Sequence, residues 1–273
     1  MQLSQAAPVA ERSDGIVLHR PEDFEGMRRA GGLAAATLDY IEPFVKPGIT
    51  TGDLDAKIEA FMLDHGAVPA TKGYRGYTKS SCISINHVVC HGIPGERALK
   101  DGDTLNIDVT VILDGWFGDT SRMFFAGKPG VKAQRLSDAT HEAMMRGIAA
   151  VKPGAHLGDI GHAIQSYAEG LRFSVVREFC GHGIGRVFHA EPSVLHYGKP
   201  GSGPELKPGM FFTVEPMINA GRAGTKVLDD GWTAVTRDRS LSMQFEHSIG
   251  VTEDGVEIFT LSPKGLHKPP YPR

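Results

Sequence analysis

The stretch NIDVTVILDGWFGDTSRMFF, residues 106–125, predicts two β-strands joined by a turn at Asp114-Gly115. An Asp-Gly pair between two alternating apolar segments is a strong signal of a two-residue hairpin turn. Asp108 interrupts the first of these segments and Asp119 the second. Carboxylates are poor strand formers and are seldom fully buried without a partner. The hairpin is therefore expected to carry something that neutralises its two acids.

The turn predicts how the two strands of the hairpin pair. It places Thr110 opposite Asp119 and Asp108 opposite Arg122. Because side chains alternate along a strand, Asp108 and Asp119 share one face as diagonal neighbours, with Cβ atoms roughly 7–8 Å apart. A four-residue loop would also place the two aspartates on one face, whereas a three-residue loop would place them on opposite faces. The two carboxylates would repel unless cations lie between them or one carboxylate binds a proton.

Composition and charge exclude several classes of protein. The chain has 273 residues, of which 41% are hydrophobic and 22% charged, as is ordinary for a globular protein. No apolar run reaches the roughly 18 residues of a membrane span, and the N-terminus lacks the apolar segment of a secretory signal. The net charge of −3 and the lack of a long basic run argue against specific nucleic-acid recognition. Three sparse cysteines indicate a reducing cytoplasm.

The sequence repeats itself in order, which indicates duplication of an αβ unit. VKPGITTGDLDAKI (45–58) aligns with VKPGAHLGDIGHAI (151–164), and LKDGDTLNID (99–108) aligns with LKPGMFFTVE (206–215). The second alignment places Asp108 opposite Glu215. The tripeptide HGI also occurs in each half, beginning at His91 and at His182. The boundary between the repeats is expected near residues 126–131.

Each repeat predicts two helices followed by strands. A VKPG segment ends the first helix of each pair, since proline cannot continue a helix and glycine supplies the turn, and Thr51 is the expected N-cap of the second helix in the first repeat. The predicted helices span about 21–43, 51–65, 131–151 and 157–171. Helices segregated from antiparallel strands predict an α+β fold of two pseudo-symmetric halves that close on a central cleft. The expected layout is a mobile N-terminal arm (1–20), a single catalytic domain (21–261) with halves of about 21–126 and 131–261, and a proline-rich tail (262–273) that packs loosely or extends.

The second half offers further candidates for a metal site. Glu215 in MFFTVEPMI and Glu246 in LSMQFEHSIGV lie in apolar, strand-like segments, and His182 lies in the glycine-rich segment CGHGIGRVFH. Each acid taken alone could instead pair with a base such as Arg122, and a single histidine is more often structural than a ligand. The acids at corresponding places in both repeats favour a metal site. This oxygen-dominated set suits Mn, Fe, Co or, less exclusively, Zn, and shared carboxylates hold two such ions about 3.5–4 Å apart for hydrolysis by a bridging water or hydroxide.

Several of these segments together resemble one enzyme family, the type I methionine aminopeptidases. The resemblance covers about Pro21 to Leu261 and rests on NIDVTVILDGWFGDTSRMF, CGHGIGRVFHAEP, FFTVEPMI and SMQFEHSIGVT, with VVCHGIP upstream. It implies a duplicated "pita-bread" fold with an antiparallel sheet, helices outside and a central metal cleft. It also implies a metalloprotease that removes the initiator methionine from new polypeptides when the next residue is small. The lack of a zinc-finger extension and of a helical insertion indicates the compact bacterial form.

The resemblance also implies a role for each candidate metal ligand. Asp108 would bind one metal through both oxygens, Asp119 and Glu246 would bridge two metals, and His182 and Glu215 would complete the other shell. Glu215 would also act as general base and proton shuttle. Outside the metal ligands, two histidines are expected to hydrogen-bond the substrate's peptide group and to steady the tetrahedral intermediate, namely His91 and His189.

A pocket for the methionine side chain is implied as well. Aromatic walls suit a flexible thioether, although tyrosine and tryptophan also pack at ordinary rims. The residues that match the family's pocket are Tyr74, Tyr77, Cys82, Phe188 and Trp232. Thr71 replaces a cysteine that is common in the family at the front of the pocket, which puts contacts at the rim in doubt but not the chemistry. Asn86 and Ser242 match residues that help to hold a monovalent cation.

The expected cofactors are two divalent ions (Co, Mn, Fe or Zn), with a monovalent cation as a further candidate. The protein is expected to be a monomer that does not bind membranes. Its expected partners are the N-terminal methionine of polypeptides and, transiently, the ribosome.

A different enzyme on the same fold, such as an Xaa-Pro aminopeptidase, prolidase or creatinase, is the nearest alternative, but those usually carry a large N-terminal domain. A catalytically inactive pita-bread domain that binds peptides is the other alternative, and such domains lose metal ligands.

Overall fold

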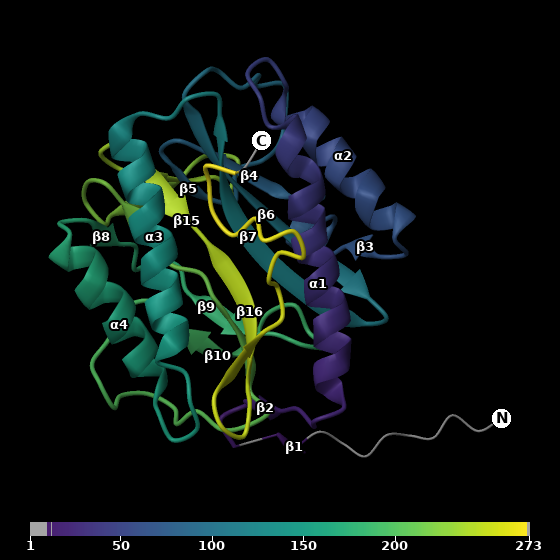
Figure 1. The fold of residues 1–273 in the computed structure, drawn as a ribbon, viewed down its shortest axis with the longest axis vertical. Helices are drawn as coiled ribbons and strands as arrows, with labels where there is room; N and C mark the ends of the chain where they lie inside the picture. Colours follow the sequence, from purple (N-terminus) through teal and green to yellow (C-terminus); the bar gives the residue numbers. More distant parts are fainter. Residues whose placement is uncertain (1–9, 12, 272–273) are drawn as a thin grey trace.

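The computed structural model describes residues 10–11 and 13–271, and it places a curved antiparallel sheet behind two pairs of helices (Figure 1). One pair belongs to the first half of the chain and the other to the second. The helices are α1 (Asp23–Ile41), α2 (Thr51–Asp64), α3 (Val131–Ala149) and α4 (Leu157–Gly170), with 3₁₀ turns at Glu42–Phe44 and Tyr74–Gly76. The four predicted helices are thus confirmed, with ends that differ from the prediction by at most two residues.

The main sheet has nine strands, seven of which run in the order β10-β9-β11-β16-β7-β6-β3, while β17 pairs with β16 and β4 with β6. Their bounds are β3 (Val68–Pro69), β4 (Cys82–Ile85), β6 (Asp103–Leu113), β7 (Trp116–Ala126), β9 (Gly181–Gly183), β10 (Ala190–Val194), β11 (Phe211–Val214), β16 (Glu246–Val251) and β17 (Val256–Ile258). Three smaller sheets contain β1 (Ala10–Glu11) with β2 (Val17–Leu18), β8 (Ser174–Val175) with β12 (Met217–Asn219) and β15 (Ser242–Gln244), and β5 (Val88–Cys90) with β13 (Thr225–Val227) and β14 (Ala234–Thr236).

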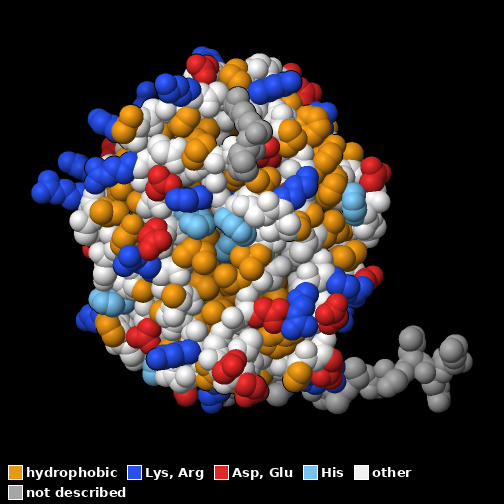
Figure 2. All heavy atoms as spheres, viewed as in Figure 1, with side chains coloured by type: hydrophobic (Ala, Val, Ile, Leu, Met, Phe, Trp, Pro, Cys, Tyr) orange, Lys and Arg blue, Asp and Glu red, His pale blue; other side chains and the backbone are white. Residues whose placement is uncertain are grey.

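The hydrophobic core is divided as the duplication predicts. One buried cluster joins α1 and α2 to β6, and a second joins α3 and α4 to β11 and β16. On the face drawn in Figure 2, acidic and basic side chains are mixed around hydrophobic side chains near the centre, so the described residues of this face form no broad area of one charge sign. No helix within the described part of the chain is both long and apolar enough to cross a membrane.

The hairpin of β6 and β7 has the predicted turn. Asp114 and Gly115 both have positive φ angles, 51° and 75°, as a type I′ turn requires. Thr110 pairs with Asp119 as predicted, but Asp108 pairs with Ser121, so the predicted pairing with Arg122 was wrong by one residue. The error matters because a shift of one residue along a strand moves a side chain to the other face of the sheet.

Arg122 consequently faces away from the two hairpin acids and is buried behind the sheet. Its Nη1 donates to Asp39 Oδ1 of α1 at 2.7 Å and its Nη2 to the carbonyl of Ala35 at 2.6 Å. Both members of the ion pair are almost completely buried. Arg122 therefore does not neutralise Asp108 or Asp119, and the alternative in which it paired with one of them is wrong.

The C-terminal residues 262–271, here called the C-terminal strap, are fastened to the body of the protein, so the expectation of a loose tail is wrong for these residues. Ser262 Oγ donates to Asp39 Oδ1 at 2.8 Å, and Tyr271 Oη donates to the carbonyl of Met123 at 2.8 Å. Lys268 pairs with Asp138 of α3 at 2.7 Å. The strap thus ties α1 of the first half to α3 of the second (Figure 1).

Two further expectations at helix and chain ends need correction. Thr50, not Thr51, is the N-cap of α2, because Thr50 Oγ1 accepts the amide hydrogen of Asp53 at 3.0 Å. The predicted mobile arm lies partly outside the described residues, which exclude 1–9 and 12. Its later part is packed, since Ile16 is buried in the core of the second half and His19 stacks on Phe211 with ring centroids 4.2 Å apart.

Candidate metal centre

A cavity of about 650 Å³ opens at the sheet between the two halves. Every side chain that the sequence suggested for the site lines it, including the five candidate metal ligands and the two candidate substrate-binding histidines. These residues are Tyr74, Tyr77, Cys82, His91, Asp108, Asp119, His182, Phe188, His189, Glu215, Trp232 and Glu246. The fold thus brings together residues that are up to 172 positions apart in the chain.

Five neighbouring strands carry one candidate ligand each. Along the sheet order β9-β11-β16-β7-β6, the ligands are His182 in β9, Glu215 directly after β11, Glu246 at the start of β16, Asp119 in β7 and Asp108 in β6. The first half supplies two of these residues and the second half three. Because the strands pair side by side, their polar side chains reach the same face of the sheet and enter one cavity.

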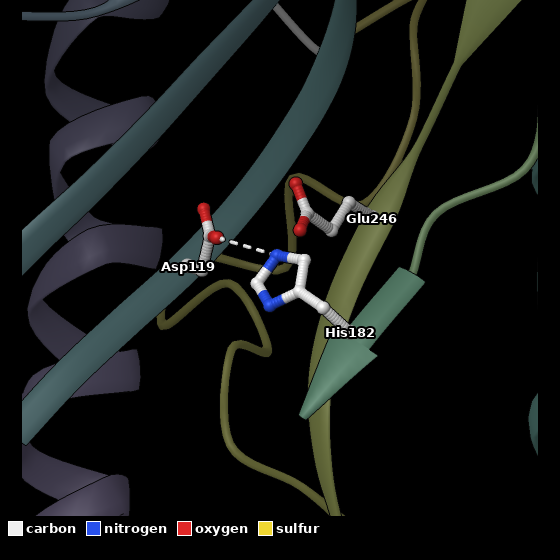
Figure 3. A group of neighbouring side chains, drawn as sticks. All are labelled: Asp119, His182 and Glu246. Atoms are coloured by element: carbon white, nitrogen blue, oxygen red, sulfur yellow. Dashed lines mark ion pairs between the residues drawn. The ribbon is translucent and has the colours of Figure 1, made fainter. Parts of the chain in front are cut away.

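Three of the ligands converge closely. Asp119, His182 and Glu246 each offer one ligand atom, and these atoms all lie within 4.8 Å of one another (Figure 3). His182 Nε2 lies 3.5 Å from Asp119 Oδ2 and 3.6 Å from Glu215 Oε1. The other ring nitrogen, Nδ1, lies 3.1 Å from the carbonyl oxygen of Gly183. A proton on Nδ1 would satisfy that carbonyl and leave the lone pair of Nε2 directed at the acids, as metal ligation requires.

Neighbouring hydroxyl and amide groups hold two of the acids in place. Thr110 Oγ1 donates to Asp119 Oδ1 at 2.8 Å, and Thr213 Oγ1 donates to Glu215 Oε1 at 2.7 Å. Gln244 Nε2 adds a contact of 3.3 Å to Glu215 Oε2. No motif in the sequence marks these supporting residues. Thr110 could have been found from its place opposite Asp119, whereas no local pattern points to Gln244.

Burial disfavours the ionised forms of Asp108, Glu215 and Glu246. Burial raises the pKa of Asp108 and of Glu246 well above its usual value, and the neighbouring carboxylates raise it further. Burial also raises the pKa of Glu215 to about 7, although His182 opposes the shift. For His182, burial lowers the pKa, but Asp119 and Glu215 outweigh that effect and the net shift is upward.

The donor set fits divalent cations. Four carboxylates and one imidazole face one another, and the only Lys or Arg side chain among the described residues that line the cavity is Arg75. No described residue donates a hydrogen bond to the carboxylate of Asp108 or of Glu246. Buried carboxylates without basic partners need protons or metal ions to offset their repulsion, and oxygen-rich sets of this kind bind Mn, Fe, Co or Zn.

Beside the acids lies an apolar pocket with aromatic walls. Tyr77 is buried, and its hydroxyl donates to the carbonyl oxygens of Ser81 and Gly92, at 3.0 and 3.1 Å. Trp232 meets Tyr77 edge to face, with ring centroids 5.0 Å apart. Because the tyrosine hydroxyl is already satisfied, the wall presents an apolar surface that suits a flexible thioether side chain.

Two histidines complete the wall of the cavity. Burial lowers the pKa of His189 to about 4, with His182 adding to the shift, and burial also lowers the pKa of His91. Both rings are therefore neutral near pH 7, so that each can donate one hydrogen bond and accept another. The ring of His189 lies between those of His182 and Tyr74, with centroid distances of 4.2 and 5.1 Å.

The chain is similar to a well-defined group of proteins. The model of metallopeptidase family M24 matches residues 25–253. The methionine aminopeptidase of Rickettsia prowazekii (strain Madrid E) is 61% identical over 257 residues, which cover 94% of this chain and 99% of that protein. The methionine aminopeptidase of Escherichia coli (strain K12) is 56% identical over 248 residues, which cover 90% and 94%.

Solved structures give the same picture at the level of the fold. The crystal structure of the Rickettsia prowazekii methionine aminopeptidase matches with a TM-score of 0.90 at 61% identity, over 90% of this chain and 100% of that one. The prolidase from Pyrococcus furiosus matches with a TM-score of 0.69 at 20% identity, over 89% of this chain and 65% of that one. At that identity the second likeness shows a shared fold alone.

Proposed function

Given that this chain belongs to metallopeptidase family M24, we propose that it removes the initiator methionine from polypeptides whose second residue is small. The enzyme is a metal-dependent exopeptidase of the methionine aminopeptidase type, as its relatives at 56–61% identity are. One observation carries the proposal most directly: four carboxylates and a histidine on neighbouring strands share a cavity with an apolar aromatic pocket.

The five candidate ligands would hold two divalent ions, with Asp119 and Glu246 shared between them. When bound, such ions lower the pKa of a water molecule and polarise the carbonyl of the scissile bond. Co, Mn, Fe and Zn all suit the donor set. Asp108 and Glu215, which occupy corresponding places in the two repeats, would each hold one end of the pair.

The remaining steps belong to the chain's own side chains. The methionine side chain would enter the pocket formed by Tyr74, Tyr77, Cys82, Phe188 and Trp232. His91 and His189 would hydrogen-bond the peptide group that follows and steady the intermediate. A carboxylate oxygen of Glu215, oriented by Thr213, would take a proton from the attacking water and return it to the leaving amine.

The substrate is tested with matched peptides. Purified protein supplied with Mn²⁺ or Co²⁺ is expected to release methionine from Met-Ala-Ser and to leave Ala-Pro-Ser intact, with mass spectrometry of the products as the measurement. Cleavage of the prolyl peptide alone would replace the proposal with an Xaa-Pro peptidase. Absence of both metal binding and hydrolysis would favour the inactive peptide-binding domain.

His189→Ala is expected to lower kcat/KM for Met-Ala-Ser by about 10²- to 10³-fold, the range found when one hydrogen-bond donor to a reaction intermediate is lost. Metal content should not change, because His189 is not one of the five ligands. Inductively coupled plasma mass spectrometry on the dialysed protein checks this point. The control is His162→Ala, which removes an exposed histidine of α4. Loss of metal from the His189 variant would show that its role has been misassigned.

We also propose a monovalent cation near Asn86 and Ser242. Asn86 has a left-handed backbone with φ of 57°, and its carbonyl accepts the amide hydrogen of Ser242 at 2.9 Å. Ser242 Oγ is buried and has no hydrogen-bond partner among the described residues. Because this oxygen has no hydrogen-bond partner among the described residues, its lone pairs are available to a cation, which supports the proposal.

We also propose that residues 21–261 form one catalytic domain and that the protein is a monomer. The proposed location is the cytoplasm, because the three free cysteines suit a reducing compartment. Transient contact with the ribosome is supported by a second pocket, of about 350 Å³. Its lining includes His87, Lys226, Arg237 and Arg239 but no acidic residue. Such a surface attracts RNA phosphates without reading sequence.

A further inference from the structure

Arg75 stands at the cavity in an unusual backbone conformation. Its φ is 46°, which is left-handed, and it lies between two glycines that are also left-handed, Gly73 (φ 88°) and Gly76 (φ 87°). Arginine is strained in this region relative to glycine, because its Cβ approaches the following carbonyl. A third glycine would adopt this conformation without strain, so the side chain of Arg75 is expected to have a function of its own.

The guanidinium of Arg75 is a positive charge without an acidic partner. It lies over the ring of Tyr74, with Cζ 5.3 Å from the ring centroid, and within the described residues no carboxylate forms an ion pair with it. Two exposed acids also line the cavity, but each is engaged elsewhere. Glu178 Oε1 accepts the amide hydrogen of Thr225 at 3.1 Å, and Glu191 Oε2 accepts that of Ser193 at 3.1 Å.

The distance between Arg75 and His189 indicates which residue of a substrate would lie near the guanidinium of Arg75. Tyr74 stacks on His189 as well as on Arg75, so the guanidinium lies within roughly 10 Å of the imidazole, a distance that an extended chain covers in about three residues. Under the proposed function His189 contacts the scissile peptide group. The chain beyond that bond would therefore bring its third or fourth residue to Arg75.

We propose that Arg75 is a specificity-determining residue that favours substrates with a carboxylate at the third or fourth position and disfavours a basic residue there. An exposed guanidinium without a partner attracts an acidic group by charge-assisted hydrogen bonding. Because the contact lies beyond the scissile bond, it selects among polypeptides that all begin with methionine and a small residue. The inference rests on the proposed aminopeptidase function and adds a selection that this function does not require.

The test measures kcat/KM for C-terminally amidated peptides, so that no terminal carboxylate competes. The set is Met-Ala-Xaa-Gly-NH₂ and Met-Ala-Gly-Xaa-NH₂, with Asp, Asn or Lys at Xaa. The quantity compared is the Asp-to-Asn ratio of kcat/KM within each protein. The wild type is expected to give a ratio of about three to ten in low salt for at least one position, and the ratio should fall toward one in about 0.5 M KCl.

The variants are Arg75→Gln and Arg75→Glu, with Arg172→Gln as a matched control. Arg172 is also an exposed arginine with a left-handed backbone (φ 65°), but it does not line the cavity. Arg75→Gln should bring the ratio to about one, Arg75→Glu should bring it below one, and Arg172→Gln should retain the wild-type ratio.

A wild-type ratio near one at both positions, or a preference that survives Arg75→Gln, would overturn the inference while leaving the aminopeptidase intact. Failure to cleave any peptide of the set would instead contradict the proposed function.

Discussion

Replacement of Glu246 by glutamine is expected to empty the site of divalent metal and to lower kcat/KM by at least about a thousandfold, the scale of losing a preorganised electrostatic partner. Glutamine has nearly the same shape but carries no charge and has only one side-chain oxygen, so it binds divalent cations much more weakly than glutamate does. Glu246 pairs with Ser121 through the backbone of β16, which glutamine preserves. Metal per chain after dialysis and the rate on Met-Ala-Ser are the measurements, and Asp108→Asn should behave likewise.

The stability of the metal-free protein separates a ligand role from a structural one. Burial raises the pKa of Glu246 in the folded chain above its unfolded value. Ionised Glu246 therefore opposes folding at neutral pH, and this opposition disappears when the pH falls below the unfolded pKa. Metal-free Glu246→Gln should consequently melt no lower than the metal-free parent at pH 7, whereas added Mn²⁺ should raise the Tm of the parent alone.

Glu253→Gln is the matched control, because Glu253 is an exposed acid just beyond the end of β16. It should keep both the metal and the rate. An active Glu246→Gln protein with full metal occupancy would remove Glu246 from the ligand set.

Arg122→Met is expected to lower the free energy of unfolding by about 3–5 kcal/mol, the cost of removing one partner from a buried ion pair. Among the described residues, the substitution leaves the buried Asp39 carboxylate with Ser262 and the amide of Lys264 as its hydrogen-bond partners. It also frees the carbonyls of Ala35 and Leu266, to which Arg122 now donates. Urea unfolding followed by circular dichroism is the measurement.

Arg146→Met gives the comparison for an exposed pair. Arg146 contacts Glu142 one turn away on α3 at 2.8 Å, with about half of each side chain exposed, and its loss should cost less than about 0.5 kcal/mol. The double variant Asp39→Asn with Arg122→Met should recover part of the stability lost in Arg122→Met, because the uncompensated charge is gone. Equal losses for Arg122→Met and Arg146→Met would show that the buried pair stabilises the protein no more than the exposed pair does.

Much of the fold could be predicted because its strongest signals are local or repeated. The Asp-Gly turn determines the pairing of β6 and β7, and the VKPG repeats mark the ends of matching helices. The prediction for Arg122 was wrong because the partner of Asp108 was placed one residue too far along β7, and neighbouring residues of a strand lie on opposite faces. The packing of the C-terminal strap could not be foreseen, since it depends on Asp39 and Met123, which are far away in the sequence.

The candidate site was predictable to a different degree. Its four acids and one imidazole are conspicuous as polar residues inside or beside apolar strands, and the structure gathers them at one cavity, although their individual roles stay predictions. Their supports are less visible. Thr213 precedes Glu215 by two residues and so shares its face, which a strand pattern can reveal. His196, whose Nε2 accepts the amide hydrogen of Glu215 at 3.1 Å, follows from tertiary packing alone.

The interleaving of the two halves has a consequence for the newborn chain. Synthesis proceeds from the N-terminus, and β16, which brings Glu246 between β7 and β11, is among the last strands to leave the ribosome. A product that ends before Glu246 therefore lacks a candidate member of the ligand set, however well its earlier helices have formed. Hydrolytic activity is therefore expected only after synthesis has passed Glu246, and shorter chains are expected to be inactive.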